Sequence, residues 1–175
     1  MQRTVVGIAL VTAGCAGLTQ PTPGTNAATA ELRNAQGQVV GTATLAEVSG
    51  GVRVLVDARG LPSGLKGVHI HAVGRCEPPG FTSAGGHFNP DGKTHGFDDP
   101  EGPHAGDLPN MAVGADGVGR LESMNERITL APGPESVLDA DGSAIVVHAA
   151  PDDFKTDPAG NSGARIACGV IVRGK

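Results

Sequence analysis

The chain has 175 residues, with 13 Lys and Arg against 18 Asp and Glu, and a formal net charge of −5. This length suits one ordinary domain, and an acidic balance without a block of Lys and Arg excludes a typical nucleic-acid-binding protein. Trp and Tyr are absent and Phe occurs four times, so the core must consist of Val, Ile, Leu and Ala. The 28 Gly and 13 Pro are typical of many short strands joined by turns.

The first 15 residues have the pattern of an export signal. Arg3 precedes a short apolar run at 4–11, and small residues follow up to Cys15. The run is too short to span a membrane. The Ala-Gly-Cys ending resembles a bacterial lipoprotein cleavage site, which would make Cys15 a lipidated residue; a plain secretory signal with an incidental Cys is the alternative. We therefore expect the periplasm or cell envelope, with membrane contact only through a lipid on Cys15.

Residues 16–28, rich in Thr, Pro, Gly and Ala, are interpreted as a flexible tether, and residues 29–175 as the folded domain. Gly50-Gly51, Asp116-Gly117 and Asp141-Gly142 are turn signals, and no segment keeps a helical period over three turns. The sequence predicts an all-β fold, an eight-stranded Greek-key β-barrel or sandwich with long loops. The predicted strands are 29–33, 38–45, 52–56, 66–73, 110–113, 119–124, 144–149 and 164–173.

One span is unusual for a compact domain. Residues 74–109 have no apolar periodicity and are rich in Gly, Pro, Asp and His. A structureless loop of this length requires something other than a core to hold it. It contains His87, His95, His104 and Asp107, three imidazoles and a carboxylate that satisfy a closed tetrahedral Zn²⁺ site. Solvated loop histidines are the alternative.

A second set of histidines lies on predicted strands. His69 and His71 are two apart in an apolar run, so both side chains point to the same side of a strand. His148 closes the apolar run 144–147. A site of three or four imidazoles without thiolate suits Cu²⁺. Two surface histidines on a half-exposed strand, and a capped core histidine at 148, are the alternatives.

The cysteines also fit an exported protein. If Cys15 carries lipid, Cys76 and Cys168 remain as an even pair, which can form one disulfide in an oxidising compartment. Two buried free thiols are the alternative.

Four segments together resemble the copper–zinc superoxide dismutase family. They are GVHIHAVG at 67–74, SAGGHFNP at 83–90, HAGDL at 104–108 and GARIACGVI at 163–171. The resemblance covers nearly all of residues 30–173 in the family's order. The CEPP stretch from Cys76 and the short segment 152–163 are similar to the bacterial exported branch.

The resemblance implies dismutation of superoxide to O₂ and H₂O₂, with Arg165 positioning the anion beside copper and His87 catalytic as the imidazolate shared by both metals. Cys76 and Cys168 match the family's disulfide. Asp152 matches a carboxylate that orients one histidine of each metal. The implied copper ligands are His69, His71, His87 and His148, and the implied zinc ligands are His87, His95, His104 and Asp107.

Two other functions remain open. A non-catalytic envelope protein that binds copper and zinc needs the same ligands, but it needs neither Arg165 nor Asp152. A β-sandwich adhesion module with incidental histidines is the other. The charged cluster that steers substrate in the eukaryotic branch has no clear counterpart, Lys155 being the one plausible local cation. The sequence leaves monomer and homodimer open.

Overall fold

The computed structural model describes residues 26–174. The export signal, Cys15 and most of the tether lie outside the described residues. Every ladder between the strands is antiparallel. The strands are β1 (Ala27–Asn34), β2 (Val39–Val48), β3 (Gly51–Ala58), β4 (Gly64–Lys66), β5 (Val68–His71), β6 (Met111–Val113), β7 (Gly119–Asn125), β8 (Ala144–His148), β9 (Arg165–Val170) and β10 (Val172–Arg173).

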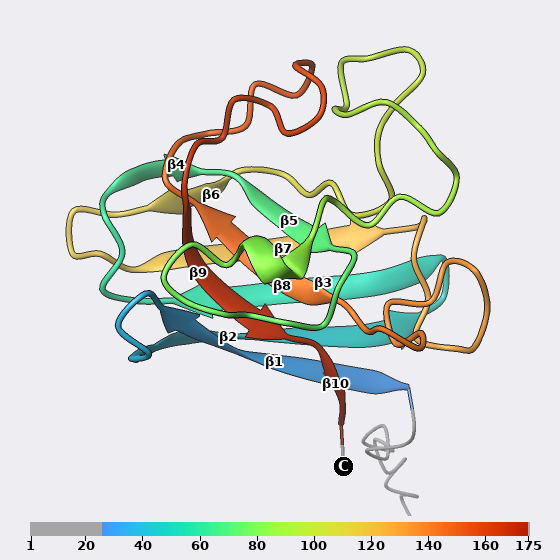
Figure 1. The fold of residues 1–175 in the computed structure, drawn as a ribbon, viewed down its shortest axis with the longest axis horizontal. Helices are drawn as coiled ribbons and strands as arrows, with labels where there is room; N and C mark the ends of the chain where they lie inside the picture. The colour runs from blue at the N-terminus through green and yellow to red at the C-terminus, as the bar shows by residue number, and fades with distance from the viewer. Residues whose placement is uncertain (1–25, 175) are drawn as a thin grey trace, which may run out of the picture.

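The strands form a barrel that is almost closed (Figure 1). Their order is β4-β6-β7-β3-β2-β1-β9-β8-β5, with β10 paired to β1. The two ends of this path, β4 and β5, are consecutive in the chain and separated only by Gly67. The predicted all-β barrel is therefore confirmed, and the gap in its wall is bridged by the chain itself.

The ten strands correspond to eight predicted ones, two of which are interrupted. The predicted strand 66–73 breaks at Gly67, whose N–H donates to the Ala150 carbonyl at 2.8 Å, outside the ladder. The predicted strand 164–173 breaks at Ile171, whose N–H donates to the Ser143 carbonyl at 2.9 Å. At the other end, β1 begins at Ala27, two residues before the predicted start of the domain, because Ala28 pairs with Leu45 and is fully buried.

The barrel interior follows the alternation of the strands. In β3, Val52, Val54 and Val56 are buried while Arg53 and Asp57 are exposed, as a sheet with one solvated face requires. Burying an aliphatic side chain of this size contributes about 1.5–3 kcal/mol. The core therefore forms without Trp or Tyr, as the composition requires.

The later part of one long loop and the whole of a second lie together at the top of Figure 1. The first joins β5 to β6 and contains only a 3₁₀ turn, η1 (Thr82–Ala84), which confirms that the span 74–109 lacks strands and helices. The second joins β8 to β9. In the described part of the chain, no helix has the length and apolar character needed to cross a membrane.

The first loop is held against β5 by backbone hydrogen bonds. The Ile70 N–H donates to the Gly106 carbonyl, and the Ile70 carbonyl accepts from Phe88, both at 2.8 Å. Isolated bridges pair His71 with His87 and His69 with Asp107. The loop therefore runs alongside the strand that carries the first two histidines.

Candidate metal centre

Seven side chains from strands and loops converge at the junction of the barrel with the two loops. They form two groups in which one donor atom from each residue lies within 4.8 Å of the others, and His87 belongs to both. The four-histidine group is His69, His71, His87 and His148; the mixed group is His87, His95, His104 and Asp107. All seven are buried. These are the residues that the sequence singled out, brought together without exception.

In the four-histidine group, three outer ring nitrogens have oxygen partners outside the group. His69 Nε2 lies 2.7 Å from an Asp152 carboxylate oxygen. His71 Nδ1 lies 2.9 Å from the Gly85 carbonyl, and His148 Nδ1 lies 3.1 Å from the Gly163 carbonyl. A nitrogen that donates to such an oxygen is protonated, so the opposite nitrogen of the ring is a free acceptor. The three free nitrogens face one another, and His148 Nε2 is 3.5 Å from His71 Nε2.

Two inner nitrogens of this group are buried without a hydrogen-bond partner, His69 Nδ1 and His87 Nε2. Orphaned polar atoms are uncommon in protein interiors and each requires an explanation. A metal ion bound by the group would supply the missing partner for both. The donors present therefore fit a metal held by four imidazoles.

The mixed group has the spacing of a single tetrahedral ion. His87 Nδ1 and His95 Nδ1 lie 2.9 and 3.1 Å from Asp107 Oδ1. His104 Nδ1 lies 3.3 Å from His87 Nδ1 and 3.6 Å from Asp107 Oδ1. Four ligands about 2.0–2.1 Å from Zn²⁺ in a tetrahedron are about 3.3 Å apart. This set is therefore the right size for zinc.

Asp107 is oriented by the backbone of its own loop. Its Oδ2 accepts the N–H of Gly96 at 2.9 Å and that of His104 at 3.0 Å, which leaves Oδ1 for the group. Burial raises the pKa of Asp107, but hydrogen bonds from His104, His87 and His95 outweigh it and hold the pKa well below its usual range. The carboxylate is therefore ionised, as a metal ligand must be.

Asp152 connects the two groups from the second loop. Its Oδ2 accepts from His69 at 2.7 Å, and its Oδ1 lies 3.0 Å from His95 Nε2. His69, His95 and Asp152 also form a third cluster of potential ligands, but the two short contacts occupy both carboxylate oxygens. Burial raises the pKa of Asp152, and hydrogen bonds from His69 and His95 reverse this and lower it.

Burial sets the charge of the four-histidine group in the metal-free protein. It lowers the pKa of His69 to about 3, of His71 to about 2 and of His148 to about 4. His95 differs, because Asp107 and Asp152 outweigh the effect of its burial and raise its pKa to about 9. The imidazoles that face one another are thus neutral at pH 7, the form that binds metals.

Arg165 lies beside the four-histidine group. It is the pairing partner of His148 between β8 and β9. Its Nη1 donates to the Phe81 carbonyl at 2.7 Å, and its Nη2 donates to the Gly85 carbonyl at 2.6 Å. Gly85 is also the acceptor for His71 Nδ1. One carbonyl therefore fixes both the cation and a histidine.

The predicted disulfide is confirmed, since Cys76 and Cys168 are bonded. Cys168 is in β9 three residues after Arg165, and Cys76 begins the loop segment that supplies the Phe81 and Gly85 carbonyls. The bridge therefore links the first loop to the strand that carries Arg165.

Two residues near the site were not found from the sequence. The Asn110 side chain forms two hydrogen bonds with the backbone of Asp152. Its Nδ2 donates to the Asp152 carbonyl at 2.9 Å, and its Oδ1 accepts the Asp152 N–H at 2.8 Å. Asp157 Oδ1 accepts the N–H of His95 at 2.8 Å. Both contacts join residues more than 40 positions apart, and no local pattern in the sequence marks them.

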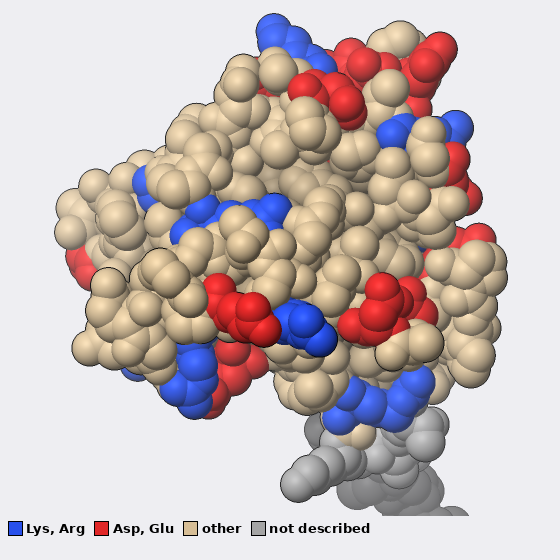
Figure 2. All heavy atoms as spheres, in the orientation of Figure 1, with Lys and Arg blue, Asp and Glu red and all other residues tan. Residues whose placement is uncertain are grey.

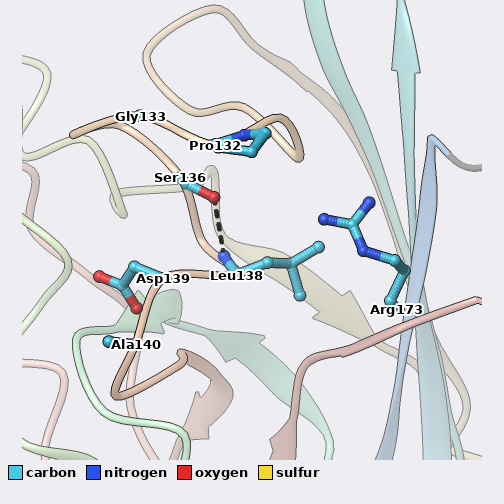
Figure 3. Close-up of a pocket in the computed structure, with 7 residues that line it drawn as sticks. All are labelled: Pro132, Gly133, Ser136, Leu138, Asp139, Ala140 and Arg173. Atoms are coloured by element: carbon cyan, nitrogen blue, oxygen red, sulfur yellow. Dashed lines mark hydrogen bonds between the residues drawn. The ribbon is translucent and has the colours of Figure 1, made fainter.

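A shallow cavity elsewhere has no part in this centre. It measures about 450 Å³ and contains none of the seven converging residues. In Figure 3 the N–H of Leu138 donates to Ser136 Oγ at 3.2 Å. Its lining is Pro132, Gly133, Ser136, Leu138, Asp139, Ala140 and Arg173.

Comparison with known proteins identifies the family. The sequence model described as copper/zinc superoxide dismutase (SODC) matches residues 39–171. The chain belongs to the copper/zinc superoxide dismutase family. It is 51% identical over 144 residues to superoxide dismutase [Cu-Zn] 2 of Aquifex aeolicus, covering 81% of this chain and 84% of that one. The family's cofactors, copper and zinc, match the two groups of donors.

The structural relatives include proteins with other names. A SOD-like protein from Bacillus subtilis superposes with a TM-score of 0.79 at 42% identity, covering 82% of this chain and 97% of that one. The clock protein EA4 superposes with a TM-score of 0.72 at 35% identity, covering 84% and 94%. The barrel alone therefore does not establish an activity, and the activity must be inferred from the side chains of the metal centre.

Proposed function

We propose that this protein dismutates superoxide to O₂ and H₂O₂, with copper in the four-histidine group and zinc in the mixed group. The single observation that carries the proposal is the position of Arg165, whose guanidinium shares the Gly85 carbonyl with His71. A site that only stores metal needs the seven ligands but no fixed cation beside them. Membership of a family whose relatives are named superoxide dismutase supports the same activity.

The assignment of the metals follows from donor chemistry. Four imidazoles suit copper, and three imidazoles with a carboxylate suit a closed zinc site. When bound, copper supplies a centre that alternates between two oxidation states, while zinc has no redox chemistry. His87 presents Nε2 to the first group and Nδ1 to the second, which suits it to bridge the two ions.

The residues of this chain can bind the anion and supply a proton. Arg165 offers a permanent positive charge and directional donors, which suit a small anion. Two superoxide anions and two protons give one O₂ and one H₂O₂, so the site must deliver protons. His87 Nε2 could hold one of them, because Nδ1 of the same ring is directed at the mixed group.

Long-range attraction of the substrate is a separate question from chemistry. On the face in Figure 2, acidic and basic side chains are interspersed, and acidic side chains gather over the two long loops at the top. No broad basic patch covers the described part of this face. We expect attraction of superoxide to be local to Arg165, since steering depends on the field near the site rather than on net charge.

Substitution of Arg165 tests this function. In protein loaded with copper and zinc, Arg165→Ala should lower kcat/KM for superoxide by at least tenfold while metal content stays at one copper and one zinc. Arg120→Ala, which removes an exposed arginine on β7, is the matched control and should change kcat/KM less than twofold. Stoichiometric metal uptake without turnover in the unaltered protein would instead favour the non-catalytic metal-binding function.

We also infer export to the periplasm or cell envelope, with Cys15 lipidated. The short apolar run, the small residues before Cys15 and the disulfide in the domain support this inference. Cys15→Ser should release the protein from the membrane fraction without retaining it in the cytoplasm. A Cys15→Ser protein that stays in the membrane fraction would contradict lipidation.

A further inference from the structure

A lysine is buried at the point where the barrel closes. Lys66 ends β4 and is 6% exposed. Its Nζ donates to the Ala149 carbonyl at 2.9 Å and to the Ser63 carbonyl at 3.2 Å. Among the described residues, no carboxylate lies within ion-pair distance of this ammonium. In the described part of the chain, the ammonium therefore donates to two neutral carbonyls.

A buried lysine whose side chain has no acidic partner requires a reason. Lysine is almost never fully buried unless it is paired, because desolvating its charge is costly. Hydrogen bonds from a charged donor contribute about 1.5–3 kcal/mol each, so two carbonyls offset much of that cost. A methionine of similar length would fill the same space without the cost. We therefore infer that the hydrogen bonds donated by the ammonium are needed at this position.

That place is the seam of the barrel. β4 and β5 are the two ends of the hydrogen-bonded sheet, and only Gly67 separates them. Next to Lys66, the Gly67 N–H donates to the Ala150 carbonyl, and the Gly67 carbonyl accepts the His148 N–H, both at 2.8 Å. Lys66 and Gly67 together thus form hydrogen bonds with three consecutive residues, 148–150, of which His148 is the first.

The acceptor for Lys66 lies just beyond the ladder that joins the histidine strands. β5 and β8 pair from Val68 with Val147 to His71 with Ala144, so His148 and Ala149 extend past it. His69 and His71 are on β5, and His148 ends β8. The distance between His148 and the other two histidines therefore depends on the contacts of Lys66 and Gly67 and on the pairing of His148 with Arg165, in addition to the β5–β8 ladder.

We propose that Lys66 is a positioning residue for the four-histidine group, fixing the backbone that follows His148 and thereby the place of His148 relative to His69 and His71. This inference rests on the proposed function, because it assumes that the group holds copper. It concerns the geometry and affinity of the copper site and predicts no direct contact between Lys66 and the metal or superoxide.

The decisive variant is Lys66→Met, which keeps an unbranched side chain one heavy atom shorter and removes the charge and the donors. In protein loaded with copper and zinc, it should change the Cu²⁺ electron paramagnetic resonance spectrum and weaken copper binding by at least tenfold in chelator competition. Zinc affinity should stay within twofold. Lys66→Arg, which restores a cation and donors, should return both copper readouts towards those of the unaltered protein.

Ser136→Ala is the matched control, since it removes another buried side-chain-to-backbone hydrogen bond, in the loop between β7 and β8 (Figure 3). It should lower the unfolding midpoint and leave the copper spectrum unchanged. If Lys66→Met does not fold, Lys66→Leu serves in its place, because its side chain is apolar and has no donor, and the same loss of copper affinity is expected.

The outcomes separate the two proposals. A Lys66→Met or Lys66→Leu protein with an unaltered copper spectrum and copper affinity would overturn the positioning role, even if its unfolding midpoint fell. An unaltered protein that binds no copper at these histidines would overturn the proposed function, and this inference with it.

Discussion

The two halves of the metal centre are built in different ways. Three members of the four-histidine group lie on β5 and β8; the pairing of these strands holds His69 and His71, and His148 is paired with Arg165 of β9. In the mixed group, His87, His95, His104 and Asp107 all come from the loop between β5 and β6, which has only one short 3₁₀ turn. The four-histidine group is thus built mainly on strands of the barrel, and the mixed group on a loop that folds back onto the barrel.

The two groups differ in the contacts that position their ligands in the absence of metal. The strand histidines are held by the ladder and by burial, and their outer nitrogens contact Asp152 and two backbone carbonyls. The loop ligands depend on a few specific bonds, chiefly those that reach Asp107, and on Asp152 from the second loop. We therefore expect the four-histidine group to be preformed and the mixed group to need zinc and the disulfide.

Removing the disulfide should have the largest effect on this contrast. The bridge between Cys76 and Cys168 spans 92 residues, and closing a loop of that length contributes about 4–5 kcal/mol in the chain-entropy model. The double variant Cys76→Ser, Cys168→Ser should lower the free energy of unfolding by about that amount, measured by urea denaturation at fixed metal content. Reductant should destabilise the unaltered protein and not the variant; equal denaturation midpoints for the two oxidised proteins would refute the prediction.

Acid should destabilise the metal-free protein through the strand histidines. Burial lowers the pKa of His69, His71 and His148 in the folded state to about 3, 2 and 4, below the value of about 6.5 in an unfolded chain. Between these limits the unfolded state binds more protons, so stability falls as pH falls below 6.5, by at most about 1.4 kcal/mol per histidine per pH unit.

His95 has the opposite sign and a different window. Its pKa is raised to about 9 by the nearby carboxylates, despite burial, so it is protonated in both states below pH 6.5 and adds no slope there. Its contribution is lost as pH rises through 9. Thermal unfolding of chelator-treated protein from pH 5 to 10 checks both windows, and His71→Ala should reduce the acid slope. A midpoint independent of pH below 6.5 would contradict the assignment.

The strands could be predicted well from the sequence because their signal is local. Val52, Val54 and Val56 alternate with exposed residues, and the Gly-containing pairs mark turns. The His69/His71 spacing places both side chains on one side of a strand for the same reason. The two breaks, at Gly67 and Ile171, were missed because each results from a hydrogen bond to a residue far along the chain.

The loop shows why the rest could not be predicted from periodicity. Its order comes from contacts such as those of Ile70 with Gly106 and Phe88 and from burial of Phe81 and Leu108, none of which leaves a repeating pattern. The grouping of its ligands came from donor chemistry and from resemblance to a family. Asn110 and Lys66, whose roles depend on distant backbone carbonyls, gave no signal.

Removing one ligand from each half should affect the loop unequally. In protein loaded with both metals, His95→Ala should speed proteolytic cleavage within residues 90–103 by about tenfold, because losing about 1.4 kcal/mol from local closure raises the open population tenfold. His71→Ala, on the strand side, should leave cleavage of that segment within twofold. Limited proteolysis with mass analysis measures both. Equal acceleration in the two variants would mean that the halves are not held independently.

The smallest expected effect concerns a contact between the two loops. The rings of Phe97 and Phe154 lie 5.6 Å apart, and the Arg127 guanidinium lies 5.6 Å above the Phe97 ring. Such aromatic and cation–π contacts contribute about 0.5–1.5 kcal/mol at partly exposed sites. Phe97→Ala should therefore lower the free energy of unfolding by about 1 kcal/mol and speed zinc loss to a chelator severalfold, leaving copper retention unchanged.

Val118→Ala is the control, because Val118 is 52% exposed against 40% for Phe97 and lies in the turn between β6 and β7. It should change neither stability nor zinc loss measurably. Faster copper loss in Phe97→Ala would show that the loop contact also holds the strand half of the centre. Unchanged zinc loss would mean that this ring contact does not help to hold the second loop against the mixed group.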